Sequence, residues 1–205
     1  MKIIHFLGKT CKSYIRSFGN QCPSLQFHCQ NCKEQRMHKH GHYQRTVTTK
    51  HQTFTIPVYR WFCPQCRRTL SLLPDFLIPW ARFTTMVREA SVVRRLQGFS
   101  FNRITQTVAT FQISISVSTI KRWWRWHLHQ APLASLWLAA KLIQRQVRTD
   151  LLRMYFHGVQ NTVVDTAKWF RELQRLFASS CNPKSVRFRG YWCWLNTLLP
   201  LSSIV

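Results

Sequence analysis

Acidic residues are the scarcest feature of this sequence, with only 6 Asp and Glu among 205 residues against 30 Lys and Arg. Nuclease and strand-transfer chemistry needs two or three clustered carboxylates to hold paired divalent ions, so this shortage weighs against such a centre. The formal net charge of +24 indicates a polyanionic partner, either nucleic acid or an anionic membrane surface.

The six acidic residues are spread along the chain: Glu34, Asp75, Glu89, Asp150, Asp165 and Glu172. The last three are the only candidates for a metal-binding trio, and a place near a helix N-terminus or in an ion pair is more ordinary for them. Glu89 is flanked by arginines, so we expect an ion pair there. The sequence has no Gly-rich phosphate loop and no His-Glu-x-x-His motif. We therefore expect a protein without catalytic activity.

Long apolar runs are also missing. The most apolar segment is interrupted by Lys141 and Arg145, before it reaches the roughly 20 apolar residues that a membrane span requires. The apolar patch at the N-terminus is interrupted by Lys9 and Lys12, where a signal peptide needs an unbroken apolar region. We expect no transmembrane helix and a cytoplasmic protein, whose eight cysteines stay reduced.

Four of these cysteines form two Cys-x-x-Cys pairs, Cys29 with Cys32 and Cys63 with Cys66. Two thiolates separated by a two-residue turn can both reach one tetrahedral ion at about 2.3 Å. A redox pair is the alternative, but a β-α-β pattern is missing around either pair. The spacing predicts a structural Zn²⁺ bound by all four thiolates.

Residues 42–51 and 54–62, between the two pairs, are rich in Val, Thr, Tyr, Ile and Phe, which predicts two strands. Pairs of cysteines in turns across a small sheet are the pattern of a zinc ribbon. Other side chains nearby could also act as ligands: Cys22, His28, His38, His40 and His42. They are weaker candidates because four thiolates already complete a tetrahedral site. The cysteines without a close partner are expected to be small buried residues: Cys11, Cys181 and Cys193.

The segment Leu72–Trp80 carries two prolines in apolar sequence, which is unfavourable inside a helix or a central strand. We expect it to be a packed linker. Beyond it, apolar residues recur at helical spacing from Val87 to Phe111. The predicted fold class is therefore a small zinc-ribbon β domain over residues 20–74, followed by a mainly α-helical region.

Turn and cap residues divide the start of this region into three helices. Gly98 can end the first, Ser100 can cap the second, and Ser116 or Ser118 can cap the third. This order predicts a helix-turn-helix DNA-binding domain over residues 80–130. The sequence just before the third helix alternates strictly between apolar and polar residues, so a strand is the competing interpretation there.

The third helix would bury Ile120, Trp123 or Trp124, and His127. Its outward residues would contact DNA: Ser118, Thr119, Lys121, Arg122 and Arg125. Two basic residues of the ribbon, Lys39 and Arg45, are expected to contact DNA as well. A basic helix lying on a membrane surface is the competing interpretation of the same segment. Residues 131–205 are expected to form a C-terminal helical region of unknown role.

The segment His40-Gly41-x-Tyr43-x-Arg45 follows the first cysteine pair, and an apolar Leu-Pro-x-Phe-Leu segment follows the second. Over residues 22–130 the chain thus resembles zinc-ribbon plus helix-turn-helix proteins that are associated with bacterial insertion sequences, and the DNA-binding N-terminal parts of some transposases. The resemblance implies recognition of double-stranded DNA for mobile-element or regulatory purposes, with a separate transposase as a possible protein partner.

The chain departs from transposases because it has neither the length nor the carboxylates for the catalytic domain that follows this region in them. The expected function is a non-catalytic, zinc-dependent DNA-binding protein. Two alternatives stay open, a transposase or transposase fragment with strand-transfer activity and an RNA-binding zinc-ribbon protein that stacks bases on exposed aromatic rings.

Overall fold

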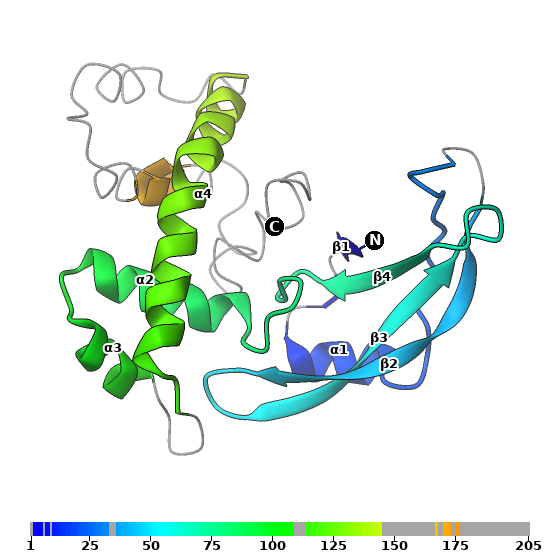
Figure 1. Ribbon diagram of the computed structural model, residues 1–205, viewed down its shortest axis with the longest axis horizontal. Coiled ribbons are helices and arrows are strands. Elements are labelled where there is room, and N and C mark those ends of the chain that lie inside the picture. The colour runs from blue at the N-terminus through cyan, green and yellow to red at the C-terminus, as the bar shows by residue number, and fades with distance from the viewer. Residues whose placement is uncertain are drawn as a thin grey trace.

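The computed structural model describes residues 2–5, 7–8, 10–32, 36–108, 114–144, 167, 170–173 and 175–176. A sheet with one helix against it forms one half of the molecule, and three helices form the other half (Figure 1). In the part of the chain so described, no helix is both long and apolar enough to cross a membrane.

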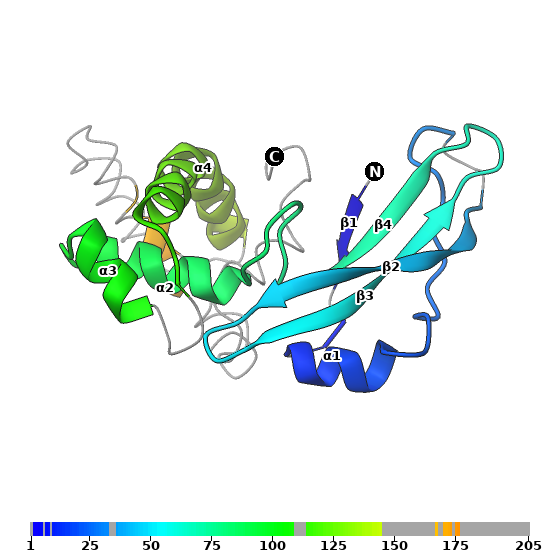
Figure 2. The ribbon, with the colours of Figure 1, turned by 60° about the horizontal axis from the view of Figure 1, so that its bottom comes forward.

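Four strands form a single sheet in the order β1-β4-β3-β2. Their bounds are Lys2–His5 for β1, His38–Thr48 for β2, Thr53–Phe62 for β3 and Thr69–Pro74 for β4. β2, β3 and β4 are antiparallel neighbours, and β1 pairs with β4 in parallel. The two strands predicted from the sequence are confirmed as β2 and β3. Figure 2 shows β1 beside β4, at the opposite edge of the sheet from β2.

The helix α1 (Cys11–Phe18) packs against the sheet (Figure 2). Its buried Tyr14 donates a hydrogen bond of 2.7 Å to the carbonyl oxygen of Pro57 in β3. Cys11 is buried, as expected, and burial raises the pKa of its thiol to about 12. The half of the molecule that contains the sheet therefore begins before residue 20. The sequence had predicted residue 20 as the start of the zinc ribbon.

The predicted linker is partly wrong. Leu72, Leu73 and Pro74 belong to β4, which lies between β1 and β3. A proline fits here because it is the last residue of the strand, where the ladder of hydrogen bonds ends. Beyond β4, the apolar side chains up to Ile78 are buried, as expected of a packed linker.

Three helices form the second half: α2 (Thr85–Leu96), α3 (Phe101–Val108) and α4 (Val117–Gln144). They share one buried cluster of apolar side chains: Val87, Ile104, Val108, Ile115, Ile120 and Trp123. Residues 114–116 form no strand, so the competing interpretation of that part of the segment is wrong.

The predicted helix ends are confirmed. Gly98 has a φ of 88°, and its N–H donates to the carbonyl oxygen of Arg95, which closes α2. The hydroxyls of Ser100 and Ser116 each accept a hydrogen bond from the backbone N–H three residues further on, at 3.2 and 3.3 Å. These are N-cap bonds, and they fix where α3 and α4 begin.

The helix α4 continues through Pro132. The predicted boundary between residues 130 and 131 therefore falls inside one helix. A proline inside a helix lacks an N–H and crowds the preceding turn. Here the apolar stripe continues past it through Ala134, Leu138 and Leu142, all buried, and this packing outweighs the local cost. The described residues between 167 and 176 are helical, and the rest of the predicted C-terminal region lies outside the described residues.

Candidate metal centre and nucleic-acid interface

Each cysteine pair lies in a tight turn held by backbone hydrogen bonds. Around the first pair, the N–H of Met37 donates to the carbonyl oxygen of Phe27 at 2.8 Å, which closes a short hairpin. The second pair lies between β3 and β4, where the N–H of Cys63 donates to the carbonyl oxygen of Arg68 at 2.9 Å. Arg67 adopts a φ of 55° to complete this turn. Both turns lie at the end of the sheet that points away from α2–α4 (Figure 1).

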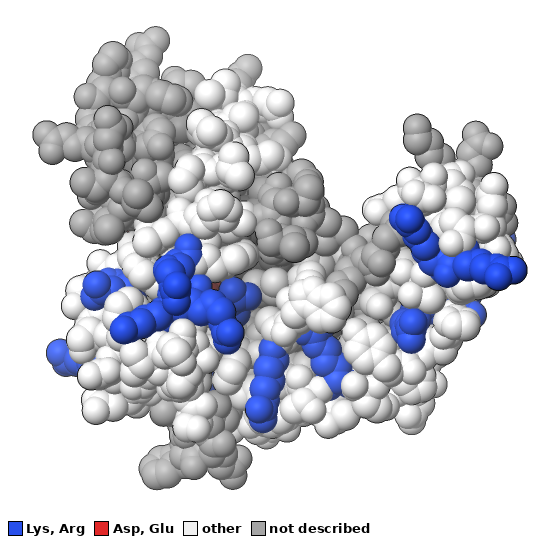
Figure 3. Space-filling model, viewed as in Figure 1, with Lys and Arg blue, Asp and Glu red and all other residues white. Residues whose placement is uncertain are grey.

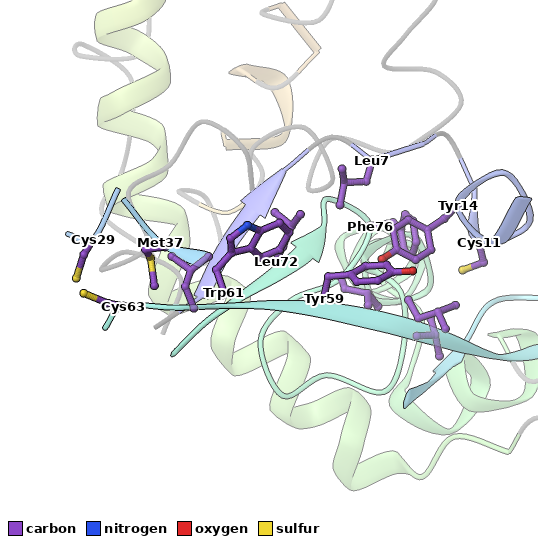
Figure 4. Close-up of a cluster of buried hydrophobic side chains, with 14 residues drawn as sticks. Leu7, Cys11, Tyr14, Cys29, Met37, Tyr59, Trp61, Cys63, Leu72 and Phe76 are labelled. Atoms are coloured by element: carbon purple, nitrogen blue, oxygen red, sulfur yellow. The ribbon is translucent and has the colours of Figure 1, made fainter. Parts of the chain in front are cut away.

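The two turns bring the four sulfur atoms together, all within 4.8 Å of one another. Cys29 Sγ lies 3.5 Å from Cys66 Sγ, and Cys63 Sγ lies 4.0 Å from Cys32 Sγ. Sulfurs that surround zinc tetrahedrally at about 2.3 Å are about 3.8 Å apart, so this donor set fits zinc. Figure 4 shows the sulfurs of Cys29 and Cys63 side by side at one end of the buried core of the sheet.

The protein environment favours a thiolate at Cys29. The backbone N–H of Cys32, followed by that of Asn31, lowers the pKa of the Cys29 thiol to about 6. Burial chiefly raises the pKa of Cys32, to about 12. A thiolate at Cys29 offers a first ligand to a divalent cation, and binding of the cation favours deprotonation of the other thiols that bind it.

The weaker ligand candidates lie outside this cluster. Cys22 is near Lys39 and Tyr59, where it lines a separate hollow of about 460 Å³. His28 is exposed on the hairpin of the first pair. His38, His40 and His42 are exposed on β2 and lie outside the cluster of four cysteines.

Figure 3 shows several patches of Lys and Arg over both the sheet and the helices on the face of the molecule in view, with almost no Asp or Glu visible among the described residues. On α4, the predicted inward residues Ile120, Trp123 and His127 are buried, which confirms this orientation of the helix. Of the five predicted contact residues on α4, only Thr119 is half-buried. The other four are exposed: Ser118, Lys121, Arg122 and Arg125. Their spacing places them on one face of the first turns.

The two predicted ribbon contacts differ from each other. Lys39 is exposed on β2 and free to approach a phosphate. Arg45 is half-buried, and its Nη2 donates to the carbonyl oxygens of Ile78 and Ala81 at 3.1 and 2.5 Å. Burial lowers the pKa of its guanidinium. Arg45 therefore ties β2 to the linker, a role for which the sequence has no signal because its partners are distant backbone atoms.

Arg88 and Trp80 are candidate residues that sequence reasoning missed. The guanidinium carbon of Arg88 lies 4.6 Å from the ring centroid of Trp126. Burial, and then the nearby charge of Arg122, lower the pKa of Arg88 to about 10. Trp80 is exposed in the linker. In the sequence, the proline directly before Trp80 is a signal that could have predicted the turn in which Trp80 lies.

The described acidic residues form no catalytic cluster. Asp75 and Glu89 are buried. Glu89 forms an ion pair, as expected, but with Arg171, which is distant in the chain, whereas the expectation came from the arginines that flank Glu89 in the sequence. Glu172 pairs with Arg175. The other two members of the candidate trio, and Glu34, lie outside the described residues. Within the described part, the four cysteines are the only group arranged to hold a metal ion.

A family model described as a domain of unknown function (DUF6431) matches residues 29–123. The match begins at Cys29 and so covers all four clustered cysteines, and it ends at Trp123 in the second turn of α4. No curated protein and no solved structure matches the chain.

Proposed function

We propose that this protein is a non-catalytic, zinc-dependent DNA-binding protein of a mobile-element system. In this proposal α4 enters the major groove of duplex DNA, and basic residues elsewhere neutralise phosphates. The observation that carries it is the exposed face of Ser118, Lys121, Arg122 and Arg125 on the first turns of a helix whose opposite face is buried.

The helical half supports this role because α4 is held by a shared core with α2 and α3, as in tri-helical DNA-binding units. We therefore assign α4 as the DNA-contacting helix by its exposed basic face. Short Ser118 lets the helix approach base edges, and Arg122 has the fork geometry that pairs with guanine.

The zinc ribbon has a structural role in the proposal. The four thiolates fix the far end of the sheet, where Lys39 at the start of β2 offers a phosphate contact. A closed site with four protein ligands leaves no open coordination position for a substrate, which suits a structural ion. The proposed link to insertion sequences comes from the resemblance of residues 22–130.

A competition experiment tests the proposal against RNA binding. The full protein is bound to labelled duplex DNA and then titrated with unlabelled duplex DNA or single-stranded RNA of equal length. We expect duplex DNA to compete at the lower concentration. Selection from a random duplex library should then return a preferred site, and more effective competition by RNA would contradict the proposal.

A further inference from the structure

Trp80 is the most exposed large apolar side chain in the described part of the chain, at 87%. It is the third residue of a turn that Ala81 closes by donating its N–H to the carbonyl oxygen of Ile78 at 3.1 Å. Pro79 at the second position and a φ of 64° at Trp80 are features of a type II turn. The third position of that turn normally holds glycine, because other residues are strained there.

The surrounding structure holds this turn in place. Arg45 donates hydrogen bonds to the carbonyl oxygens on both sides of the turn, at Ile78 and Ala81. Just beyond it, the N–H of Thr48 donates to the carbonyl oxygen of Arg82 at 2.9 Å. A strained residue that is fixed this firmly and whose large side chain is mostly exposed points to a role in binding.

Two hollows lie on either side of Trp80 and share it with Ala81 and Arg82. The hollow on the side of the helices has a volume of about 560 Å³, within the range of small-molecule sites, and the one on the side of the sheet has about 440 Å³. Both have aromatic side chains in their walls. The exposed side chain of Trp80 thus lines both hollows.

The hollow beside the helices is strongly basic. Arg82, Arg88 and Arg122 line it, and none of its described lining residues is acidic. The Nε atom of Arg88 is buried without a hydrogen-bond partner in the described part of the protein. An aromatic ring surrounded by cations complements a ligand that is planar and carries adjacent negative charge, which is the chemistry of a nucleotide.

We propose that Trp80 stacks on one unpaired nucleobase while Arg82 and Arg88 neutralise the phosphates beside it. Arg122 lies in the same hollow and on the DNA-contacting face of α4, so the unpaired base would directly adjoin the bound duplex. The protein then binds a junction between duplex and single strand more tightly than a continuous duplex. This inference rests on the proposed function only for the binding of the duplex, and the stacking of the unpaired base on Trp80 does not depend on it.

The test compares the affinity of the full protein for four labelled DNAs at one salt concentration. These are a blunt duplex, the same duplex with a short unpaired extension at its 3′ end, the same duplex with the extension at its 5′ end, and the single strand alone. We expect one of the extended duplexes to bind about 5- to 100-fold more tightly than the blunt one, the range that stacking of a single base supplies.

Two substitutions at Trp80 separate stacking from folding. Trp80→Gly suits the turn, so it should remove the preference without lowering the midpoint of thermal unfolding. Trp80→Phe keeps a ring and should retain part of the preference. The matched control is Leu133→Ala. Leu133 is also an exposed apolar residue, but it lies on α4, so its replacement should leave the preference unchanged.

Equal affinity of the wild-type protein for blunt and extended duplexes would overturn this inference and leave the proposed function standing. A preference that survives Trp80→Gly would also overturn it. Binding of the single strand without binding of any duplex, lost on Trp80→Gly, would support the stacking site and contradict the proposed function.

Discussion

The guanidinium of Arg45 donates a hydrogen bond of 2.5 Å to the carbonyl oxygen of Ala81, a residue in the linker between the sheet and the helices. A second bond from the same nitrogen reaches Ile78. These contacts join β2 to the linker and so help to set the position of Trp80 between the two halves. A residue expected to contact DNA therefore holds the structure that presents a candidate binding site.

Replacing Arg45 with Met should destabilise the protein, because the carbonyl oxygens of Ile78 and Ala81 lose a charged donor. We expect the free energy of unfolding to fall by about 1–3 kcal/mol, the range for hydrogen bonds to a charged group. Urea denaturation measures this change. Lys39→Met, on the exposed part of the same strand, is the control and should leave stability nearly unchanged. Equal stability of the two variants would contradict this role of Arg45.

The cluster of four cysteines predicts one bound zinc ion per chain. Cys63→Ala should lose the ion and unfold the end of the sheet, because the binding free energy of a structural zinc contributes directly to folding. Cys22→Ala should keep the ion, since Cys22 lies outside the cluster. Elemental analysis of the purified variants measures the zinc content. Wild-type protein purified without bound zinc, or full zinc content in Cys63→Ala, would contradict the assignment.

His127 predicts a loss of stability in mild acid. Its burial, together with the nearby charge of Arg171, lowers the pKa of the folded state from 6.5 to about 4. The unfolded chain therefore binds this proton more readily, and stability falls as the pH drops below about 6.5 and levels off below about 4. At about 1.4 kcal/mol for each pH unit, the loss approaches roughly 3 kcal/mol.

Urea denaturation between pH 7 and pH 4 measures this loss. His127→Gln should show a shallower dependence on pH than the wild-type protein, although both share the acid sensitivity of the thiolates. Identical pH profiles for the two proteins would show that His127 does not titrate as its burial requires.

How far the sequence predicted the fold depended on the range of the interactions. The cysteine pairs, the strands β2 and β3 and the caps Ser100 and Ser116 were predictable, because each depends on residues close together in the chain. The parallel pairing of β1 with β4 was not, since it joins residues near 3 to residues near 72. The continuation of α4 through Pro132 depends on tertiary packing that the local rule for proline does not include.

The candidate site shows the same division. The spacing of Cys29, Cys32, Cys63 and Cys66 was enough to predict that the four thiols meet. At Trp80, by contrast, the preceding proline signals a turn, but the sequence does not specify that the side chain of Trp80 is exposed there or that its φ is positive.

Sequence discrimination should depend on α4. Arg122→Ala should cost roughly 1–3 kcal/mol at the preferred duplex and relax the preference for one base pair there, if Arg122 pairs with guanine. Lys39→Ala should weaken specific and random duplexes alike and reduce the salt dependence by about one phosphate contact. Titrations of both variants against both duplexes measure these effects. Equal weakening of the two duplexes by Arg122→Ala would remove α4 as the source of discrimination.

The salt dependence of duplex binding tests the central claim most directly. The dissociation constant of the wild-type protein for a random duplex is measured at several salt concentrations and plotted logarithmically. With a formal charge of +24, we predict a steep line, because each neutralised phosphate releases condensed counterions and contributes about 0.9 to the slope. A nearly flat line, or no binding at low salt, would contradict the proposal that this basic protein binds DNA.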